Sequence, residues 1–334
     1  MGANIKTIAA AAGVSVASVS RALNGQPGVS AKTRRRIERL ARELAYVPDA
    51  QAQALVSGRS PFLGLVVPDI TNPFFTTLAR GAEEAAYDHG YSLLLVNTNW
   101  QAARVPNALQ LLTSRRVAGL LLAVPLERLA PVPDWERLAP ATVMAGQPAP
   151  AGAGLVAGEV DDVKGGVLMG RHLLAAGCRR LAYLAGPASD SASARRLEGL
   201  RAALREHGDG ATLVTACFGQ WTEAWGASAT RALLAEHDLD GLFAANDLIA
   251  FGAFQAAAEQ GRRPGRDLAI AGYDDIDAAA RAAVPLTSVA QPTREVGREA
   301  VRRLVARLEG TADPGDLRLP PALVPRASSQ RTEL

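Results

Sequence analysis

Basic side chains are concentrated in the first 60 residues of this 334-residue chain, where they could bind a polyanion. This segment holds nine Lys and Arg against three acidic residues, a net charge of +6, which leaves 27 basic and 30 acidic residues for the rest. A positive segment joined to a slightly acidic remainder indicates that the first segment binds a polyanion and that the rest of the chain has a different function. A solvated basic helix face without a partner is the alternative that charge alone leaves open.

Arg21 stands out among these basic residues because two small apolar residues precede it at helical spacing. On a helix, Val16, Ala17 and Arg21 would share the outward face. A guanidinium group there can donate two hydrogen bonds to guanine, while small apolar side chains can touch a thymine methyl group. Plain packing is the alternative role for Val16.

Three short helices would position these side chains within residues 1–46, which we term the head. Asn4 can cap the first helix, and Gly13 then ends it in a tight turn. The second helix is predicted to start at Ser15 and the third to follow Ser30. The predicted inward residues are Val19, Ala22 and Leu23, then Ile37, Leu40, Ala41 and Leu44, with Arg34, Arg35, Arg36, Arg39 and Arg42 mostly outside. Three helices around a small core, with a turn between the first two, are typical of a helix-turn-helix unit.

The sequence of the head resembles that of LacI/GalR-type regulators. The resemblance covers IAAAAGVSVASVSRALNG at residues 8–25 and VSAKTRRRIERLARELAYVPDAQAQAL at residues 29–55. In that family the second helix enters the major groove, so the resemblance implies double-stranded DNA as a partner. It implies Val16, Ala17 and Arg21 as base readers, with Ser15, Ser18 and Asn24 near the DNA backbone. Helix capping is the alternative role for the serines.

Residues 47–60 are predicted to be a linker. The sequence DAQAQALVSGRSP is helix-prone in its middle and ends in Gly58 and Pro61. A lone helix this short is marginal in water, so it would form only when something packs against it. In the resembled family the segment folds on DNA, pairs with its twin and wedges a leucine into the minor groove, and Leu55 matches that position. Without the resemblance, Leu55 is an ordinary linker residue.

Short apolar runs alternate with amphipathic helices from Phe62 onward, in the part of the chain that we call the body. The predicted strands are Phe62–Val67, Tyr91–Val96, Gly119–Val124, Ala141–Ala145, Arg180–Ala185, Thr212–Cys217, Gly241–Ala244 and Leu268–Gly272. The predicted helices include Pro73–His89, Val163–Ala176, Ser193–His207, Trp221–His237, Asn246–Gln260 and Thr293–Leu308. Alternation of this kind gives parallel sheets with helices on both faces. So many strands divide into two lobes, with a break near Gly152–Asp161.

Landmarks along the body resemble the periplasmic-binding-protein-like core of the same regulators. They are VPDITNPFF at 67–75, AGP at 185–187, RRLEG at 195–199, AND at 245–247, GYDD at 272–275 and LTSVAQP at 286–292. The predicted fold class is therefore an all-α helix-turn-helix head followed by an α/β two-lobed, type I periplasmic-binding-protein-like core with parallel sheets. The resemblance implies one lobe from residues 61–160 with 291–318, and another from residues 161–290 with 319–334.

A cleft between two such lobes is the default ligand site, because open parallel sheets bind ligands beyond the carboxyl ends of their strands. By matching motif, Phe74 and Phe75 would form an apolar wall and Trp221 would stack on the ligand. The implied hydrogen-bonding residues are Arg196, Asn246 and Asp274. Such a set suits a small polyhydroxylated effector, most simply a carbohydrate. Helix capping by Asn246 and Asp274, and core packing of Trp221, are the alternatives.

Two positions in the first lobe depart from sugar-responsive members of the family. An Asp that is common after the strand Thr142–Ala145 is replaced here by Gly146-Gln147-Pro148. A polar residue that is common near the end of Gly119–Val124 is replaced by Ala123-Val124-Pro125. The first lobe is therefore expected to offer fewer polar groups than a typical sugar site.

Other kinds of site are not supported by the sequence. Cys178 and Cys217 make no disulfide framework, the N-terminus lacks a signal-peptide pattern, and no apolar run approaches the ~20 residues that span a bilayer. These features favour a cytoplasmic protein. GAGLVAG at 152–158 has the wrong spacing and setting for a dinucleotide loop, and the four histidines lack metal-ligand spacing. Without a catalytic set of residues, we expect no enzyme activity, no metal and no cofactor.

The leading hypothesis is a homodimeric repressor that binds a pseudo-palindromic operator and responds to a small-molecule effector in the cleft. A two-fold dimer of helix-turn-helix units matches a two-fold DNA site. One alternative is a solute-binding protein of a transport system, which would carry a signal peptide and lack the basic head. Another is a sugar- or nucleotide-processing α/β enzyme, which would need catalytic residues.

Overall fold

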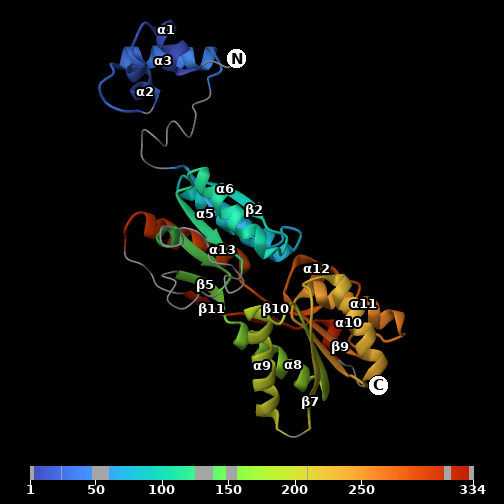
Figure 1. Cartoon of the computed structure of the whole chain (residues 1–334). Helices are drawn as coiled ribbons and strands as arrows, with labels where there is room; N and C mark the ends of the chain where they lie inside the picture. Colours follow the sequence, from blue (N-terminus) through green and yellow to red (C-terminus); the bar gives the residue numbers. More distant parts are fainter. Residues whose placement is uncertain are drawn as a thin grey trace. The chain divides into compact units, whose positions relative to one another are not determined.

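The computed structural model of the chain describes residues 4–23, 25–46, 60–124, 138–147, 156–208, 210–311 and 317–330 (Figure 1). Contacts between residues divide the chain into two compact units, Met1–Pro61 and Phe62–Leu334. The first unit contains the head, and the second is the body. Each is described below by itself.

Three helices form the head: α1 (Ile5–Ala12), α2 (Val16–Leu23) and α3 (Ala31–Glu43). Asn4 caps α1, because its Oδ1 accepts a hydrogen bond of 3.0 Å from the Thr7 N–H. Gly13, with a φ of 59°, ends α1 in the left-handed conformation that glycine adopts without strain. The buried core consists of Ile8, Ala9, Ala12, Val19, Ala22, Ile37 and Ala41. The predicted helical head is therefore confirmed.

Leu44 is not part of this core, contrary to the predicted inward stripe. Helix α3 ends at Glu43, and Leu44 is its C-cap with 36% of its surface exposed. Ala45 then adopts a φ of 47°, which turns the chain away from the helical path. Helical periodicity places a side chain only as far as the helix runs, and this helix stops one residue too early for Leu44.

The first lobe of the body is built on a parallel sheet of six strands in the order β11-β5-β4-β3-β1-β2. The strands are β1 (Phe62–Val67), β2 (Ser92–Asn97), β3 (Gly119–Leu122), β4 (Thr142–Ala145), β5 (Val156–Val160) and β11 (Leu317–Leu319). Its helices are α5 (Pro73–Asp88), α6 (Val105–Ser114) and α13 (Thr293–Leu308), with short 3-10 turns at Ala102–Arg104 and Ala139–Ala141.

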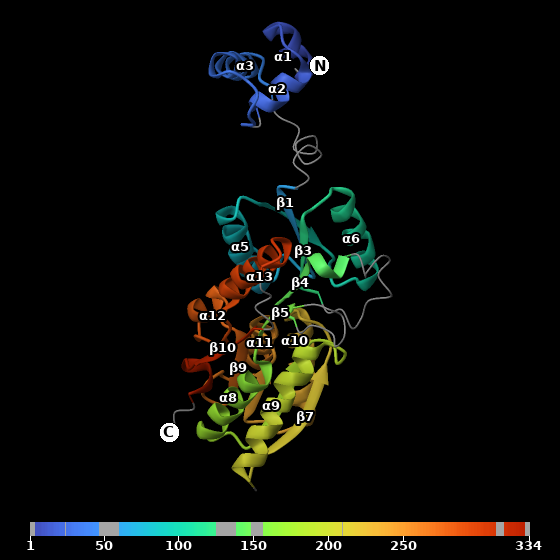
Figure 2. The same ribbon diagram turned by 90° about the vertical axis from the view of Figure 1, so that its left-hand side faces the viewer.

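Helices pack on both faces of this first sheet (Figure 2). Alternate side chains of a strand point to opposite faces. Leu63 and Leu65 of β1 pack with α5 and α13, whereas Val66 packs with α6. Each face thus has its own apolar layer, which is why the β1 sequence FLGLVV is continuously apolar.

The second lobe holds another six-stranded sheet, in the order β12-β10-β9-β8-β6-β7. The strands are β6 (Arg180–Ala185), β7 (Thr212–Phe218), β8 (Gly241–Ala244), β9 (Ala269–Asp274), β10 (Thr287–Ala290) and β12 (Ala322–Val324). The helices are α8 (Asp162–Ala175), α9 (Ser191–His207), α10 (Glu223–Glu236), α11 (Asp247–Glu259) and α12 (Asp277–Arg281), with a 3-10 turn at Ala327–Ser329. Only β12 pairs antiparallel among these described strands, and the pairs α8–α9 and α10–α11 cover the sheet. The expected architecture of two lobes with mainly parallel sheets is confirmed.

Along the described segments, the chain passes between the lobes after β5, after β10 and after β11. Asn72, Gly146 and Asn246 come shortly after the carboxyl ends of β1, β4 and β8, and Asp274 is the last residue of β9. All four residues line one cleft. The topology therefore gathers residues that are far apart in the sequence at one site.

Six of the described helices and strands were not among the predicted ones, including the five-residue helix α12. The other five are the strands β5, β10, β11 and β12 and the helix α6. Strand β5 reads VAGEV, and β11 and β12 have three residues each, too short to show an alternating pattern. Pairing with neighbours in the sheet, rather than local propensity, defines such strands.

Candidate functional site

The outer face of α2 carries the side chains that the sequence assigned to DNA. Val16 is 41% exposed, and Ala17 and Arg21 are also exposed, while Val19 and Ala22 are buried. The side chain of Arg21 makes no hydrogen bond or ion pair with any described residue. Val16, Ala17 and Arg21 therefore form an open surface that can meet the edges of bases.

Ser15 and Ser18 are engaged with each other at the start of α2. The Ser15 Oγ accepts from the Ser18 N–H at 3.1 Å, and the two hydroxyl groups lie 2.9 Å apart. Ser15 thus caps the helix, as the alternative interpretation allowed. One of the two hydroxyl protons is used in the contact between them, and the other can still donate to a phosphate, so capping does not compete with a backbone contact. Asn24, Leu55 and the predicted linker up to residue 59 lie outside the described residues.

Arg34 has a role that the sequence analysis missed. Its two terminal nitrogens donate to the main-chain oxygens of Ala22 and Gln26, each at 2.7 Å. These bonds tie α3 to the carboxyl end of α2 and fix the orientation of the reading helix. The spacing of the residues could have predicted this inward position. Arg34 lies three residues before Ile37 and therefore on the same inward face of the helix.

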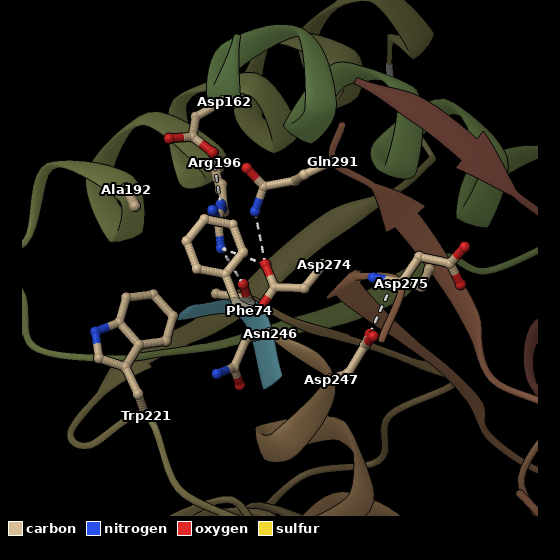
Figure 3. A network of polar contacts seen from close by, with 12 residues as sticks. Phe74, Asp162, Ala192, Arg196, Trp221, Asn246, Asp247, Asp274, Asp275 and Gln291 are labelled. Atoms are coloured by element: carbon tan, nitrogen blue, oxygen red, sulfur yellow. Dashed lines mark hydrogen bonds and ion pairs between the residues drawn. The ribbon is translucent and has the colours of Figure 1, made fainter. Parts of the chain in front are cut away.

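A cleft between the two lobes contains all six residues predicted to bind an effector. The described residues that line it are Asn72, Phe74, Phe75, Trp100, Gly146, Gln147, Asp190, Ala192, Arg196, Trp221, Asn246, Asp274 and Gln291. It encloses about 430 Å³ of space, part of which opens to solvent. Both lobes contribute, as Figure 3 shows for Phe74 of the first lobe beside Arg196 and Asp274 of the second.

Arg196 is the only cation among the described lining residues, and it is 6% exposed. Its Nε donates to Asp162 Oδ1 at 2.8 Å, and its Nη1 donates to the Ala245 oxygen and lies 3.9 Å from Asp274 Oδ1 (Figure 3). Its guanidinium carbon lies 3.7 Å from the centroid of the Tyr273 ring. Burial alone would lower the pKa of Arg196, but the neighbouring carboxylates raise it, so the guanidinium is charged and rigidly held. Arg196 lies in the second turn of α9.

Asp274 closes β9 with an unusual backbone. Its φ is 104°, and Asp275 follows with a φ of 52°. Gln291 Nε2 donates to Asp274 Oδ1 at 2.7 Å. Burial raises the pKa of Asp274 to about 7, against the opposing influence of Arg196. A non-glycine residue in this region is strained, and such strain is typical of functional positions. Asp274 caps no described helix, so that alternative does not apply.

Asn246 does cap a helix, as its alternative interpretation proposed. Its Oδ1 accepts from the Ile249 N–H at 2.9 Å at the start of α11. The same residue lines the cleft, so its amide N–H groups are left to donate to a ligand. A cap and a ligand contact are compatible because they use opposite ends of the amide.

Aromatic side chains form the apolar part of the cleft. Phe74 and Phe75 meet edge to face with ring centroids 5.0 Å apart. Trp221 is 8% exposed and precedes α10 instead of lying in it, and its Nε1 donates to Asp190 Oδ2 at 3.2 Å. Trp100, which the sequence analysis missed, stacks near Trp221 with ring centroids 6.5 Å apart.

Gln147 gives the first lobe a polar group close to the end of β4, where the Asp common in sugar-responsive members is absent. It lines the cleft, is 9% exposed, and its Oε1 is buried without a hydrogen-bond partner among the described residues. Asn72 adds a second polar side chain from the same lobe. An amide oxygen can accept a hydrogen bond at this strand end, as a carboxylate would. Pro125 and Pro148 lie outside the described residues.

Asp247 is a buried carboxyl group next to the cleft and not part of its lining. Its oxygens accept from the Ser288 hydroxyl at 2.7 Å and the Ile276 N–H at 2.8 Å. Burial holds its pKa well above the usual range. These bonds join α11 to the turn after β9, so Asp247 supports the strained position of Asp274.

The described residues contain no cluster of His, Cys, Asp or Glu that could hold a metal ion. Among the helices that they form, none combines the length and apolar character of a membrane span.

A helix-turn-helix head and a two-lobed body with a polar and aromatic cleft define a class of effector-responsive DNA-binding regulators. Comparisons with known proteins agree. Residues 4–49 match the model of bacterial regulatory proteins of the lacI family, and residues 171–329 match a periplasmic binding protein-like domain. The chain is 32% identical to the ribose operon repressor of Escherichia coli K12 over 98% of this chain and 100% of the relative. The chain belongs to the LacI family and is a DNA-binding transcriptional regulator.

Two solved structures resemble the whole chain. The Lac repressor dimer bound to operator and the anti-inducer ONPF has a TM-score of 0.83 and 26% identity, covering 98% of this chain and 99% of that one. A complex of the transcriptional regulator CelR with cellobiose has a TM-score of 0.71 and 32% identity, with the same coverage. Members of this family are regulators and not enzymes, so the solute-binding and enzyme alternatives are set aside.

Proposed function

We propose that the chain is a homodimeric repressor whose affinity for its operator is controlled by an uncharged, polyhydroxylated effector, most simply a sugar, bound in the cleft. In this proposal residues 1–46 read DNA and residues 47–60 link them to the lobes formed by 61–160 with 291–318 and by 161–290 with 319–334. The proposed DNA contacts are Ser15, Val16, Ala17, Ser18, Arg21, Asn24 and Leu55. The proposed effector contacts are Phe74, Phe75, Arg196, Trp221, Asn246 and Asp274, joined by Gln147.

The observation that carries this proposal is the unpaired Oε1 of Gln147 in a cleft walled by aromatic rings. A buried acceptor without a partner is costly, and a ligand hydroxyl group would relieve that cost. The carboxylates of Asp190 and Asp274 are further acceptors. The face of a sugar ring carries C–H groups that can lie on Trp221, while its rim carries the hydroxyl groups.

The charges of the cleft favour an uncharged ligand. Among the described lining residues, Asp190 and Asp274 are acidic and Arg196 alone is basic. Arg196 is already engaged by Asp162, Asp274 and the Ala245 oxygen. A phosphate or carboxylate would meet two acids without a free cation, and burying an unpaired charge is strongly unfavourable. Sugar phosphates and sugar acids are therefore expected to bind weakly.

Relatives support the same ligand class and assembly. The E. coli relative is a ribose operon repressor, CelR was solved with cellobiose, and the Lac repressor was solved as a dimer on its operator. By analogy, two heads would bind two half-sites, and a ligand would act through its different affinity for two arrangements of the lobes.

The test is a titration of the full-length protein on fluorescent DNA from its own promoter region with neutral sugars, sugar phosphates and sugar acids. We expect at least one neutral sugar to change operator affinity and the anionic derivatives to have little effect. Gln147→Met should lower effector affinity by about 0.5–1.5 kcal/mol, one hydrogen bond, without destabilising the ligand-free body. Binding to the promoter region no tighter than to random DNA, or a response to anionic sugars only, would contradict the proposal.

A further inference from the structure

Trp100 connects the apolar cores of the two lobes. It follows β2 in the first lobe and packs against the core of that lobe, which includes Phe75 and Leu78. It also packs against the core of the second lobe, which includes Trp221. No other partly buried apolar side chain in the described residues packs against both of these cores.

The contact between Trp100 and Trp221 lies in the wall of the cleft. The two rings are nearly parallel, with centroids 6.5 Å apart and planes inclined by 29°. Phe75 packs edge to face behind Trp100 at 5.9 Å. The position of Trp221 is fixed in turn, because a Cβ atom at Gly186 would lie 2.1 Å from its ring. The two indoles, one from each lobe, therefore meet in the wall of the cleft without any ligand.

The backbone around Trp100 is bent to hold the ring there. Asn99 and Trp100 both have a φ of 56°, a conformation that bulky residues rarely adopt. The Trp100 N–H donates to the Pro68 oxygen at 2.9 Å, and the Thr98 N–H donates to the Val67 oxygen at the same distance. The loop is thus tied to the end of β1 in a strained form, and strain of this kind is retained where a position has a role.

We propose that Trp100 is a specificity-determining residue that limits the cleft to an effector with a single sugar ring. This inference rests on the proposed function. The cleft reaches about 430 Å³ only when space open to solvent is counted, so its enclosed part is smaller than ligand sites, which span roughly 300–1,000 Å³. A second sugar ring at the Trp221 end would displace Trp100 and break its contacts with both cores. The bound disaccharide of CelR means that the limit is a property of this chain and not of the family.

Binding measurements on the full-length protein test the size limit. Neutral single-ring sugars, among them ribose and glucose, and disaccharides that contain the same rings, such as cellobiose, are titrated by calorimetry into the wild type, Trp100→Ala and Trp100→Phe. We expect the wild type to prefer the single ring by about tenfold or more, the scale on which a close-fitting pocket rejects extra bulk. Trp100→Ala should remove most of that preference, and Trp100→Phe should keep most of it.

Three results would overturn the inference. The wild type could bind a disaccharide as tightly as its single ring, or Trp100→Ala could leave the ratio unchanged. A wild type that binds no sugar of either size would overturn the carbohydrate assignment, and the size limit with it. If only the size limit is wrong, a sugar still binds the cleft and changes operator affinity. That outcome is therefore distinguishable from a failure of the proposed function, in which no sugar binds.

A ligand-free measurement tests the contact itself, even where Trp100→Ala destabilises the body. Stacked indoles give a coupled signal in the near-ultraviolet circular dichroism spectrum. We expect Trp100→Phe and Trp221→Phe to remove the same band, while the matched control Trp225→Phe, which lies outside the lining, leaves it. Equal spectral changes in all three variants would overturn the cross-lobe contact on which the inference depends.

Discussion

The head and the body each present an arginine to a ligand, but in opposite settings. Arg21 is exposed on α2 and makes no hydrogen bond or ion pair with the described residues. Arg196 is 6% exposed and is held by Asp162, the Ala245 oxygen and the Tyr273 ring. DNA would supply the partners of Arg21, whereas the protein itself already supplies partners for the Nε and Nη1 groups of Arg196.

This difference follows from the ligands that the two surfaces meet. DNA is a large polyanion, so an exposed cation can gain phosphate and base contacts without being prearranged. A small effector offers few contacts, and its site must already be ordered for those contacts to give useful affinity. The head should therefore tolerate changes in its reading residues without unfolding, while changes at a cleft residue that is already paired, such as Arg196, should affect both binding and stability.

Replacing Arg196 should have the largest effect. Arg196→Ala leaves Asp162 and Asp274 buried without their cation, and breaking a buried pair in this way costs about 3–5 kcal/mol. We expect the free energy of unfolding of the body to fall by that amount and the effector response to vanish. Urea unfolding of the full-length protein, followed by tryptophan fluorescence, measures the first effect.

The matched control is Arg171→Ala, which removes an arginine from the exposed pair with Glu206 at 2.7 Å. An exposed ion pair contributes about 0–1 kcal/mol, so its loss should barely change the unfolding curve. Similar destabilisation by the two variants would show that Arg196 is not more tightly organised than a surface arginine.

Arg21 should show the reverse pattern. Arg21→Ala should weaken binding to the specific operator by about 1–3 kcal/mol, the value of one bidentate base contact, and weaken non-specific binding less. The free energy of unfolding and the effector affinity should stay at wild-type values, because the Arg21 side chain makes no hydrogen bond or ion pair with a described residue. Equilibrium DNA binding at fixed salt, with specific and random duplexes, measures both quantities.

Arg35, exposed on α3, provides the charge-matched control. Arg35→Ala removes the same charge, so it should affect specific and random DNA about equally. If Arg21→Ala also weakened both duplexes equally, Arg21 would be a general electrostatic contact and not a base reader.

The head could be predicted from the sequence more completely than the cleft. Helical periodicity and the capping residues Asn4 and Gly13 located α1 to α3, because these signals are local. Periodicity was less reliable at the end of α3, where Leu44 leaves the helical path. Arg34 was assigned outward although its spacing from Ile37 placed it on the inward stripe.

The cleft was predicted only where a motif marked it. Arg196, Asn246 and Asp274 belong to recognisable segments, and the structure places all three in the lining. Trp100 and Gln147 lie in loops after strands, where no periodic pattern applies and only the tertiary fold brings them in. Local sequence does not show that these residues share a cleft, because their positions follow from the way the chain passes between the two lobes.

Effector affinity should also depend on pH, with the smallest effect of the series. Burial raises the pKa of Asp274 to about 7, close to physiological pH. Its charge is felt by Arg196, Asp162 and the buried Asp247. The ionised carboxylate is the better acceptor for sugar hydroxyl groups, so affinity should rise by up to about tenfold between about pH 6 and pH 8. Calorimetric titrations across this range, with Asp274→Asn as the pH-independent control, measure the change.

Stability of the ligand-free body should move in the opposite direction. Because the folded pKa of Asp274 lies above the usual value of 3.8, its contribution to stability is fully present below that value and is lost as the pH rises through about 7. Asp274→Asn should remove this part of the dependence, since an amide does not ionise. Effector affinity that falls with rising pH, or that keeps its slope in Asp274→Asn, would mean that another group governs the titration and that the preorganised acceptor of the cleft is not Asp274.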